Sequence, residues 1–258
     1  MPATRRIFAA LGVASLALAT PGVASASLAR SGNGIGALNA NEVLARSADA
    51  LAKEKNLVVD GKLNYDKEAI TFNVRSSGRG KDVAGTLTIR TGTQAIGPVT
   101  FVDLPSALYL RAGAPFWRAE IASIKSVSAT AVNAAVAKIA GRWIEVTGSE
   151  AATFSSSFGE LTEPGKFAQS LLKGNGTLTK GAPKVLRDHL VLPIMTSDGA
   201  TIFIALTGAP VPVEISGTST VKASTVSLDA LINTPARLAI KAPHGAETLA
   251  SLSGTLAS

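Results

Sequence analysis

The sequence predicts an α+β fold in which a long antiparallel β-sheet is covered by helices. Short segments on either side of the chain's middle alternate apolar and polar residues with a period of two, and tight turns join them. Helical patterns stand between the two groups of segments. About ten strands are expected. A sheet of this length with one apolar face must curl, close or be covered, and the helices are the available cover. A sheet with the helices inside it and a sandwich with helices at one end both stay open.

The first 26 residues have the features of an export signal. Arg5 and Arg6 form a basic start, residues 7–19 a weakly apolar stretch, and residues 24–26 a small-residue cleavage site. We expect cleavage near Ala26 and export to the periplasm, the cell envelope or the medium. Residues 4–8 also resemble the twin-arginine pattern, so general and twin-arginine export both stay open.

The mature chain is predicted to hold a single domain over residues 41–245. A flexible Ser/Gly/Asn-rich lead, residues 27–40, precedes it, and a flexible tail, residues 246–258, follows it. Asn41 is the predicted N-cap of the first helix. The apolar stripe of this helix consists of Val43, Leu44, Ala48 and Leu51.

The first group of predicted strands lies between residues 70 and 110. Turn residues separate the strands at positions 76–80, 90–92 and 104–106. Successive short strands joined in this way favour antiparallel pairing. The side chains expected on the apolar face are Ile70, Phe72, Val74, Leu87, Ile89, Val99, Phe101, Leu108 and Leu110.

Helices are predicted over residues 129–140, 151–158 and 164–173, with a short strand at 142–146. Gly141 suits the end of the first helix, and Pro164 suits the first turn of the third. The sheet then resumes. Its apolar face is predicted to carry Leu190, Leu192, Ile194, Ile202, Ile204, Leu206, Val211, Val213 and Ile215. A weaker strand is expected at residues 218–227 and a last one at 238–240.

The composition favours a binding or carrier protein over an enzyme. The chain has no cysteine and two histidines, so thiol chemistry is excluded and imidazole chemistry has little to draw on. Ser170 and Lys173 match a Ser-x-x-Lys pattern, but the accompanying motifs of serine-lysine hydrolases are missing. No metal or cofactor site is predicted, and the absence of a basic run with interleaved aromatics argues against nucleic-acid binding.

Several segments together resemble a known family. They are Gly85-Thr-Leu-Thr-Ile89, Phe101-Val102, Ala107-Leu-Tyr-Leu-Arg-Ala112, Pro115-Phe-Trp117, Gly141-Arg-Trp-Ile-Glu-Val146 and Leu178-Thr-Lys-Gly181. Their order and spacing are similar to those of the LppX/LprG-type (LppX_LprAFG) lipid-carrier lipoproteins of the actinobacterial envelope. The resemblance covers roughly residues 41–240, and each motif alone is loose.

The resemblance implies a LolA/LolB-like fold, a half-barrel closed by helices over an apolar cavity. It also implies binding of lipid or glycolipid acyl chains and transient contact with the envelope membrane or a lipid exporter. The family carries a lipobox cysteine after its signal, and this chain has none. We therefore expect a carrier that is not lipid-anchored.

The candidate ligand-binding residues line the apolar face and its helical cover. They are Ile70, Phe72, Val74, Leu87, Ile89, Phe101, Leu108, Leu110, Phe116, Phe167, Leu171, Leu190, Leu192, Ile202, Ile204, Val213 and Ile215. The alternative is an exported interaction or scaffold domain in which the same residues form a filled core. Phe116 and Trp117 fit a cavity rim, and they also fit a core that closes the sheet edge.

Overall fold

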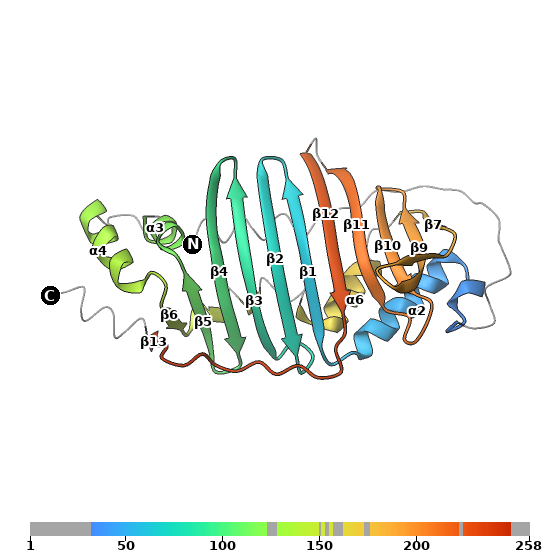
Figure 1. Cartoon of the computed structure of the whole chain (residues 1–258), viewed down its shortest axis with the longest axis horizontal. Coiled ribbons are helices and arrows are strands. Elements are labelled where there is room, and N and C mark those ends of the chain that lie inside the picture. The colour runs from blue at the N-terminus through green and yellow to red at the C-terminus, as the bar shows by residue number, and fades with distance from the viewer. Residues whose placement is uncertain are drawn as a thin grey trace.

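The computed structural model describes residues 32–122, 128–149, 151–152, 155–156, 162–172, 176–221 and 224–248. These residues form one large, open sheet of 13 strands, with helices toward its two ends (Figure 1). The predicted α+β class, with a large curved sheet and helices, is confirmed. The predicted signal segment, residues 1–26, lies outside the described residues.

The strands follow one another along the chain with short connections. They are β1 (Leu57–Tyr65), β2 (Glu68–Ser77), β3 (Asp82–Thr91), β4 (Gln94–Leu104), β5 (Ala107–Ala112), β6 (Trp143–Val146), β7 (Leu178–Lys180), β8 (Lys184–Leu186), β9 (His189–Thr196), β10 (Ala200–Ala205), β11 (Pro212–Val221), β12 (Ser224–Asn233) and β13 (Glu247–Thr248). Their order in the sheet is β13-β6-β5-β4-β3-β2-β1-β12-β11-β10-β9-β7, and β8 pairs with β9.

Two antiparallel meanders make up the sheet, as the two groups of alternating segments predict. Strands β1 to β5 form one, strands β9 to β12 form the other, and an antiparallel pairing of β1 with β12 joins them. Strand β1 was not predicted from the alternation of apolar and polar residues. The predicted strand 218–227 covers the end of β11 and the start of β12, which are separate strands in the structure. In β1, Gly61 interrupts the apolar period, which explains why its pattern is weak.

The C-terminal part of the chain differs from the prediction in two places. Residues 238–240, predicted as a strand, have no regular secondary structure. Glu247 and Thr248, predicted as part of a flexible tail, form β13 and pair in parallel with β6. The sheet is therefore mixed rather than purely antiparallel.

The helices match the prediction in part. They are a 3₁₀ turn, η1 (Ile35–Ala37), and the α-helices α2 (Ala40–Lys53), α3 (Ala114–Ala122), α4 (Ala129–Ile139) and α6 (Pro164–Leu172). Helices α4 and α6 lie where they were predicted. The predicted helix 151–158 lies partly outside the described residues.

The N-cap of α2 was predicted wrongly. The cap is Asn39, not Asn41: the Asn39 side chain accepts a hydrogen bond from the Glu42 amide at 3.0 Å, and the Asn39 amide donates to the Glu42 carboxylate at 3.1 Å. This reciprocal pair satisfies two backbone donors at the start of the helix. Spacing favours Asn39 because Glu42 stands three residues after it.

The last part of the predicted lead is packed against the sheet. The Asn33 side-chain amide donates to the carbonyl oxygens of Ala205 and Gly208, and Ile35 is fully buried. The Lys180 ammonium on β7 donates to the carbonyl oxygens of Gly36 and Leu38 at 3.0 and 2.7 Å. These contacts hold the chain across the β7 end of the sheet before α2 begins.

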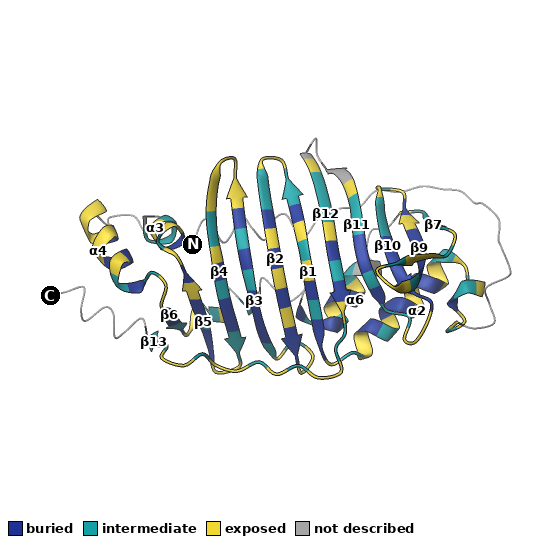
Figure 2. Cartoon of the chain, viewed as in Figure 1, coloured by how far each residue is buried: buried dark blue, intermediate teal, exposed yellow. Residues whose placement is uncertain are grey.

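Burial divides the sheet into two regions (Figure 2). In β2, buried and exposed residues alternate strictly from Ile70 to Arg75, so one face is apolar and the other polar. In β9 and β10, residues 191–194 and 202–205 are buried without a break, so both faces are covered there. Among the described residues, no helix is long and apolar enough to cross a membrane.

Candidate functional site

The face of the sheet that packs toward the helices, called the inner face here, brings most of the predicted residues together. Cross-strand register aligns them in rows, for example Phe72 with Leu87 and Leu87 with Val99. The predicted residues that are buried in one continuous apolar cluster are Ile70, Phe72, Val74, Leu87, Ile89, Phe101, Leu108, Leu110, Phe116, Phe167, Leu192, Ile202, Ile204 and Ile215.

Three predicted residues stand apart from this cluster. Leu190 is half-buried and packs against its edge. Val213 is half-buried and does not join the cluster, because the pairing of β10 with β11 shifts register between Phe203 and Ile204. The side chain of Leu171 lies outside the described residues.

Two glycines on the inner face accommodate the rings of the two phenylalanines paired with them. A Cβ at Gly61 would lie 2.8 Å from Cζ of Phe72, and a Cβ at Gly85 would lie 2.8 Å from Cε1 and Cζ of Phe101. Each ring therefore leans across to the neighbouring strand and lies low on the sheet. The two largest inner-face side chains of β2 and β4 thus project little into the space above the sheet.

Helix α3, which no sequence pattern predicted, fixes the aromatic pair. Phe116 and Trp117 pack edge to face, with ring centroids 5.1 Å apart and planes at 74°. The Trp117 indole N–H donates to the Ala112 carbonyl oxygen at 3.1 Å. Both residues are buried. They close the β5 end of the sheet in the manner of core aromatics.

Polar groups interrupt the inner apolar surface at a few points. Ser47 on α2 and Ser76 on β2 are buried, and their hydroxyls have no hydrogen-bond partner among the described residues. Asp103 occupies an inner-face position at the end of β4, two residues beyond Phe101. Burial raises the pKa of the Asp103 carboxyl above its usual range, and a hydrogen bond with Ser155 lowers it in part.

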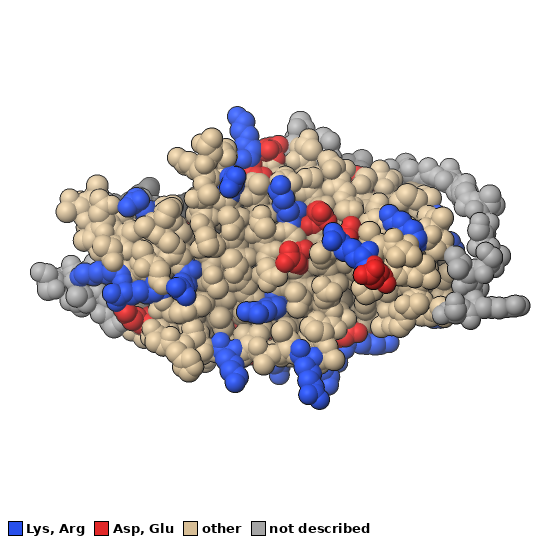
Figure 3. All heavy atoms as spheres, viewed as in Figure 1, with Lys and Arg blue, Asp and Glu red and all other residues tan. Residues whose placement is uncertain are grey.

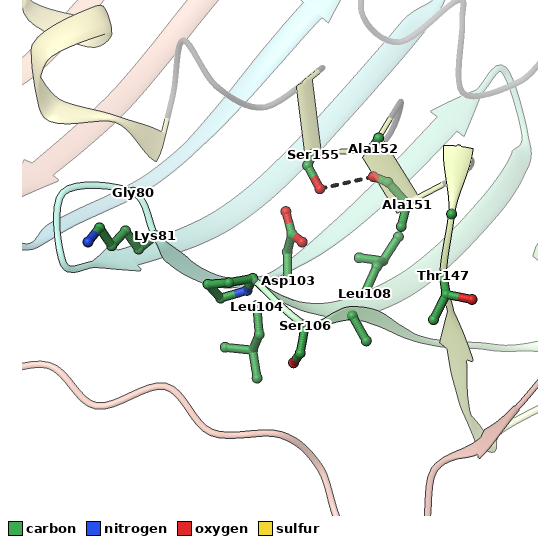
Figure 4. A pocket seen from close by; sticks show the side chains of 13 residues that line it. Gly80, Lys81, Asp103, Leu104, Ser106, Leu108, Thr147, Ala151, Ala152 and Ser155 are labelled. Carbon is green, nitrogen blue, oxygen red and sulfur yellow. Dashed lines mark hydrogen bonds between the residues drawn. The ribbon is translucent and has the colours of Figure 1, made fainter.

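A pocket of about 360 Å³ opens beside Asp103 (Figure 4). It lies at one end of the strands, where the β2–β3 turn, the β4–β5 turn and the segment that follows β6 come together. Its lining residues are Gly80, Lys81, Asp103, Leu104, Pro105, Ser106, Ala107, Leu108, Thr147, Gly148, Ala151, Ala152 and Ser155. This site was not predicted from the sequence. The sequence did contain one indication of it. Asp103 follows Val99 and Phe101 at a spacing of two, so it places a carboxylate on a strand face that is otherwise apolar.

The opposite face of the sheet is polar and carries scattered charge (Figure 3). Exposed basic side chains pair with acidic ones, as in Arg142 with Glu247 and Arg187 with Glu214. The pair of Lys166 with Glu163 lies instead at α6, behind the sheet in this view (Figure 1). On the described part of this face, basic side chains are more frequent than acidic ones, and the two signs are interspersed over its centre (Figure 3).

The motifs considered for catalysis have ordinary structural surroundings. The Ser170 hydroxyl donates to the Phe167 carbonyl oxygen of its own helix at 2.7 Å. In the described part of the chain, no three histidine or acidic side chains are grouped so that they would hold a metal ion.

Comparison with known proteins yields likenesses of fold. No family model matches the chain, and no curated protein matches it. Among solved structures, LprF from Mycobacterium bovis superposes with a TM-score of 0.47 and 12% identity, over 80% of this chain and 97% of that one. LprF is a lipoprotein of the LppX/LprG family, the family that the sequence motifs resemble.

Two further solved structures match the chain at lower TM-scores. An uncharacterised conserved protein from Thermus thermophilus gives a TM-score of 0.33 at 7% identity, over 81% of this chain and 98% of that one. MucB, solved in complex with MucA(peri), gives 0.32 at 10% identity, over 80% and 59%. At such low identity the likeness concerns the fold alone, so function must be argued from the residues of this chain.

Proposed function

We propose that this protein is an exported, non-catalytic carrier that holds the acyl chains of a lipid or glycolipid between the inner face and the helices. It moves them within the cell envelope and contacts the envelope membrane or a lipid exporter transiently. In this proposal the segment over residues 1–26 is the export signal, and the chain is not lipid-anchored.

The observation that carries the proposal is the flat placement of the two phenylalanine rings on glycines. A sheet face that is apolar over its whole width normally needs large side chains to fill the space beneath a helical layer. Here Phe72 and Phe101 lie against Gly61 and Gly85, and the neighbouring inner residues are aliphatic. In the proposed carrier, acyl chains supply apolar volume between these residues and the helices. Their burial contributes about 0.8 kcal/mol per methylene, and no charged partner is needed.

A filled core is the second candidate, and burial favours it. The inner-face residues Leu87, Val99 and Phe101 are 6%, 3% and 0% exposed. The pocket beside Asp103 lies at the end of the sheet rather than over its centre. With a filled core, the protein would be an exported interaction or scaffold domain.

The test adds bulk to the inner face and compares it with bulk on the outer face. Leu87→Trp places a large ring on the inner side of β3, and Thr86→Trp, its neighbour, places the same ring on the outer side. All proteins are expressed with their own leader in an actinobacterial host. Bound lipid is then measured by native mass spectrometry and by extraction.

A carrier gives a clear pattern in this experiment. The wild type and Thr86→Trp retain lipid, whereas Leu87→Trp loses most of it, at least about fivefold, and melts within about 2 °C of the wild type because the ring replaces acyl chain. A filled core gives apo mass for all three proteins. It also makes Leu87→Trp less stable by about 1–3 kcal/mol through overpacking. That result would contradict the carrier proposal.

A further inference from the structure

The pocket beside Asp103 continues the inner apolar face. Asp103 pairs with Val83 on β3 and with Leu108 on β5, both of which are buried in the apolar cluster. Leu108 also lines the pocket. From it, Leu110 and Ala112 continue along the inner side of β5. The buried apolar cluster therefore borders the pocket, and its side chains on β5 continue from there along the inner face.

Asp103 has spare capacity for hydrogen bonds. In Figure 4 its carboxylate points toward the Ser155 hydroxyl across the pocket. That hydroxyl has a single proton and a second acceptor, the Ala151 carbonyl oxygen at 2.9 Å. Ser155 is the hydrogen-bond partner of Asp103 among the described residues. A carboxyl group offers about four lone-pair sites. Most of them are therefore available to hydroxyl groups of a ligand.

The charges around the pocket disfavour an anionic ligand. Lys81 lies at the rim, and in Figure 4 its ammonium points away from Asp103. The second carboxylate nearby, Glu163, packs on Gly80 and is already paired with Lys166 at 2.6 Å. An anion entering the pocket would meet the Asp103 carboxylate without a cation facing it. An ammonium group would lose hydration against the apolar lining residues Leu104, Pro105 and Leu108, which costs more than it does for an uncharged hydroxyl group.

We propose that this pocket, through Asp103 and Ser155, binds the uncharged, hydroxyl-rich head group of the lipid whose acyl chain lies along the inner face. The inference rests on the proposed function and adds the chemical class of the head group. The volume of about 360 Å³ is at the small end for ligand pockets, which suits a polyol or a single sugar. The Ser155 hydroxyl donates to the Ala151 carbonyl oxygen, and its own oxygen can accept a hydrogen bond from a hydroxyl of the ligand.

The experiment compares three amphiphiles that share one chain and differ in the head. Equal concentrations of 1-monooleoylglycerol, oleic acid and oleylamine compete for the delipidated mature protein at about pH 7.5, and native mass spectrometry measures occupancy. We expect monooleoylglycerol to exceed oleic acid and oleylamine about tenfold. Free glycerol, added as a fourth competitor, is expected to displace none of them at equal concentration.

Substitutions then assign the preference to Asp103. Asp103→Leu is expected to weaken monooleoylglycerol binding about tenfold and to leave oleic acid unchanged or tighter. Asp103→Asn, which keeps an acceptor oxygen, is expected to hold monooleoylglycerol within about threefold. Asp60→Leu removes an exposed carboxylate from the outer face and is expected to change nothing. Circular dichroism confirms that each variant is folded.

The possible failures are distinguishable. If none of the oleoyl compounds binds, the carrier proposal fails and this inference fails with it. If all three bind equally and Asp103→Leu alters none of them, the carrier proposal stands and the head-group inference is wrong. Tighter binding of oleylamine, or displacement by free glycerol as effective as by monooleoylglycerol, would also overturn the inference, in favour of a cationic head group or a free polyol.

Discussion

The two ends of the apolar cluster are built differently. Around β9 and β10 the sheet is covered on both faces, whereas around β2 and β3 it is apolar on one face and polar on the other. Ile194 and Ile204 are fully buried in the first region. Leu87 in the second region is 6% exposed and lies between Phe72 and Val99.

The outer face of β9 and β10 is covered by neighbouring segments of the same polypeptide. The Lys184 ammonium on β8 lies 4.4 Å from the ring centroid of Phe203. The Arg187 guanidinium reaches the nearly buried carboxylate of Glu214 at 3.0 Å. On the opposite side, Lys180 and Asn33 hold the chain before α2. This region is a closed three-layer core that holds the protein together.

The central strands have no comparable second layer on their outer face among the residues that the structure describes. Their outer positions are polar, as with the hydrogen bond from Asn73 to Asp60 at 2.8 Å. Their inner positions are aliphatic or hold a ring laid on glycine. The two regions therefore differ in their outer cover, whereas the inner positions of both are buried in the same apolar cluster.

The largest expected difference between the two regions follows from removing core methyl groups. Ile204→Ala is expected to cost about 3–4 kcal/mol in unfolding free energy, because a closed core relaxes little around a cavity. If the protein is a carrier, Leu87→Ala in the delipidated protein is expected to cost about 1–2 kcal/mol, because bound lipid would supply part of the contacts of Leu87. Urea unfolding of both variants measures the difference. Equal costs would mean that both regions are equally well packed.

A smaller effect is expected where the lead is held against β7. Lys180→Met keeps the length of the side chain and removes two hydrogen bonds to the carbonyl oxygens of Gly36 and Leu38. We expect a loss of about 1.5–3 kcal/mol, the range for hydrogen bonds to charged groups. Hydrogen exchange should become faster at residues 33–38 and stay unchanged in β2 and β3. Lys62→Met, at an exposed outer position, is the control and should alter neither region.

The smallest expected effect is the pH dependence of Asp103→Asn. Burial raises the pKa of Asp103 in the folded protein above its ordinary value of 3.8. Between the pKa of Asp103 in the unfolded chain and its higher pKa in the folded protein, this carboxyl is protonated in the folded state and ionised in the unfolded chain. The unfolding free energy therefore falls as the pH rises through this interval. The substitution removes that loss and is expected to stabilise the protein at pH 7 by about 0.5 kcal/mol or less, since the group stays half-solvated.

Measurements of the melting temperature against pH test this expectation. The advantage of Asp103→Asn should shrink as pH falls toward 3.8 and vanish below it, where both side chains are neutral. If the stability of Asp103→Asn relative to the wild type instead increases as the pH falls, folding favours the ionised form of Asp103. Asp103 would then be paired, contrary to the open site described above.

Prediction from the sequence failed at identifiable places, each with a physical reason. Helix α3 was missed because Phe116 and Trp117 are adjacent and give no helical period; their positions depend on the indole hydrogen bond to Ala112. The covered outer face of β9 and β10 was missed although Leu190–Ile194 and Ile202–Leu206 are nearly continuous apolar runs. Such runs are typical of strands buried on both faces.

By itself, the sequence determined the fold class, the two meanders, helices α4 and α6, and which side chains share the inner face. These follow from periodicity and turn residues, which act over a few neighbouring positions. The tertiary structure alone decided that Phe72 and Phe101 lie on Gly61 and Gly85, and that Asp103 meets Ser155 in a pocket. Such contacts join strands and loops whose register is set only when the whole sheet assembles, so no local pattern encodes them.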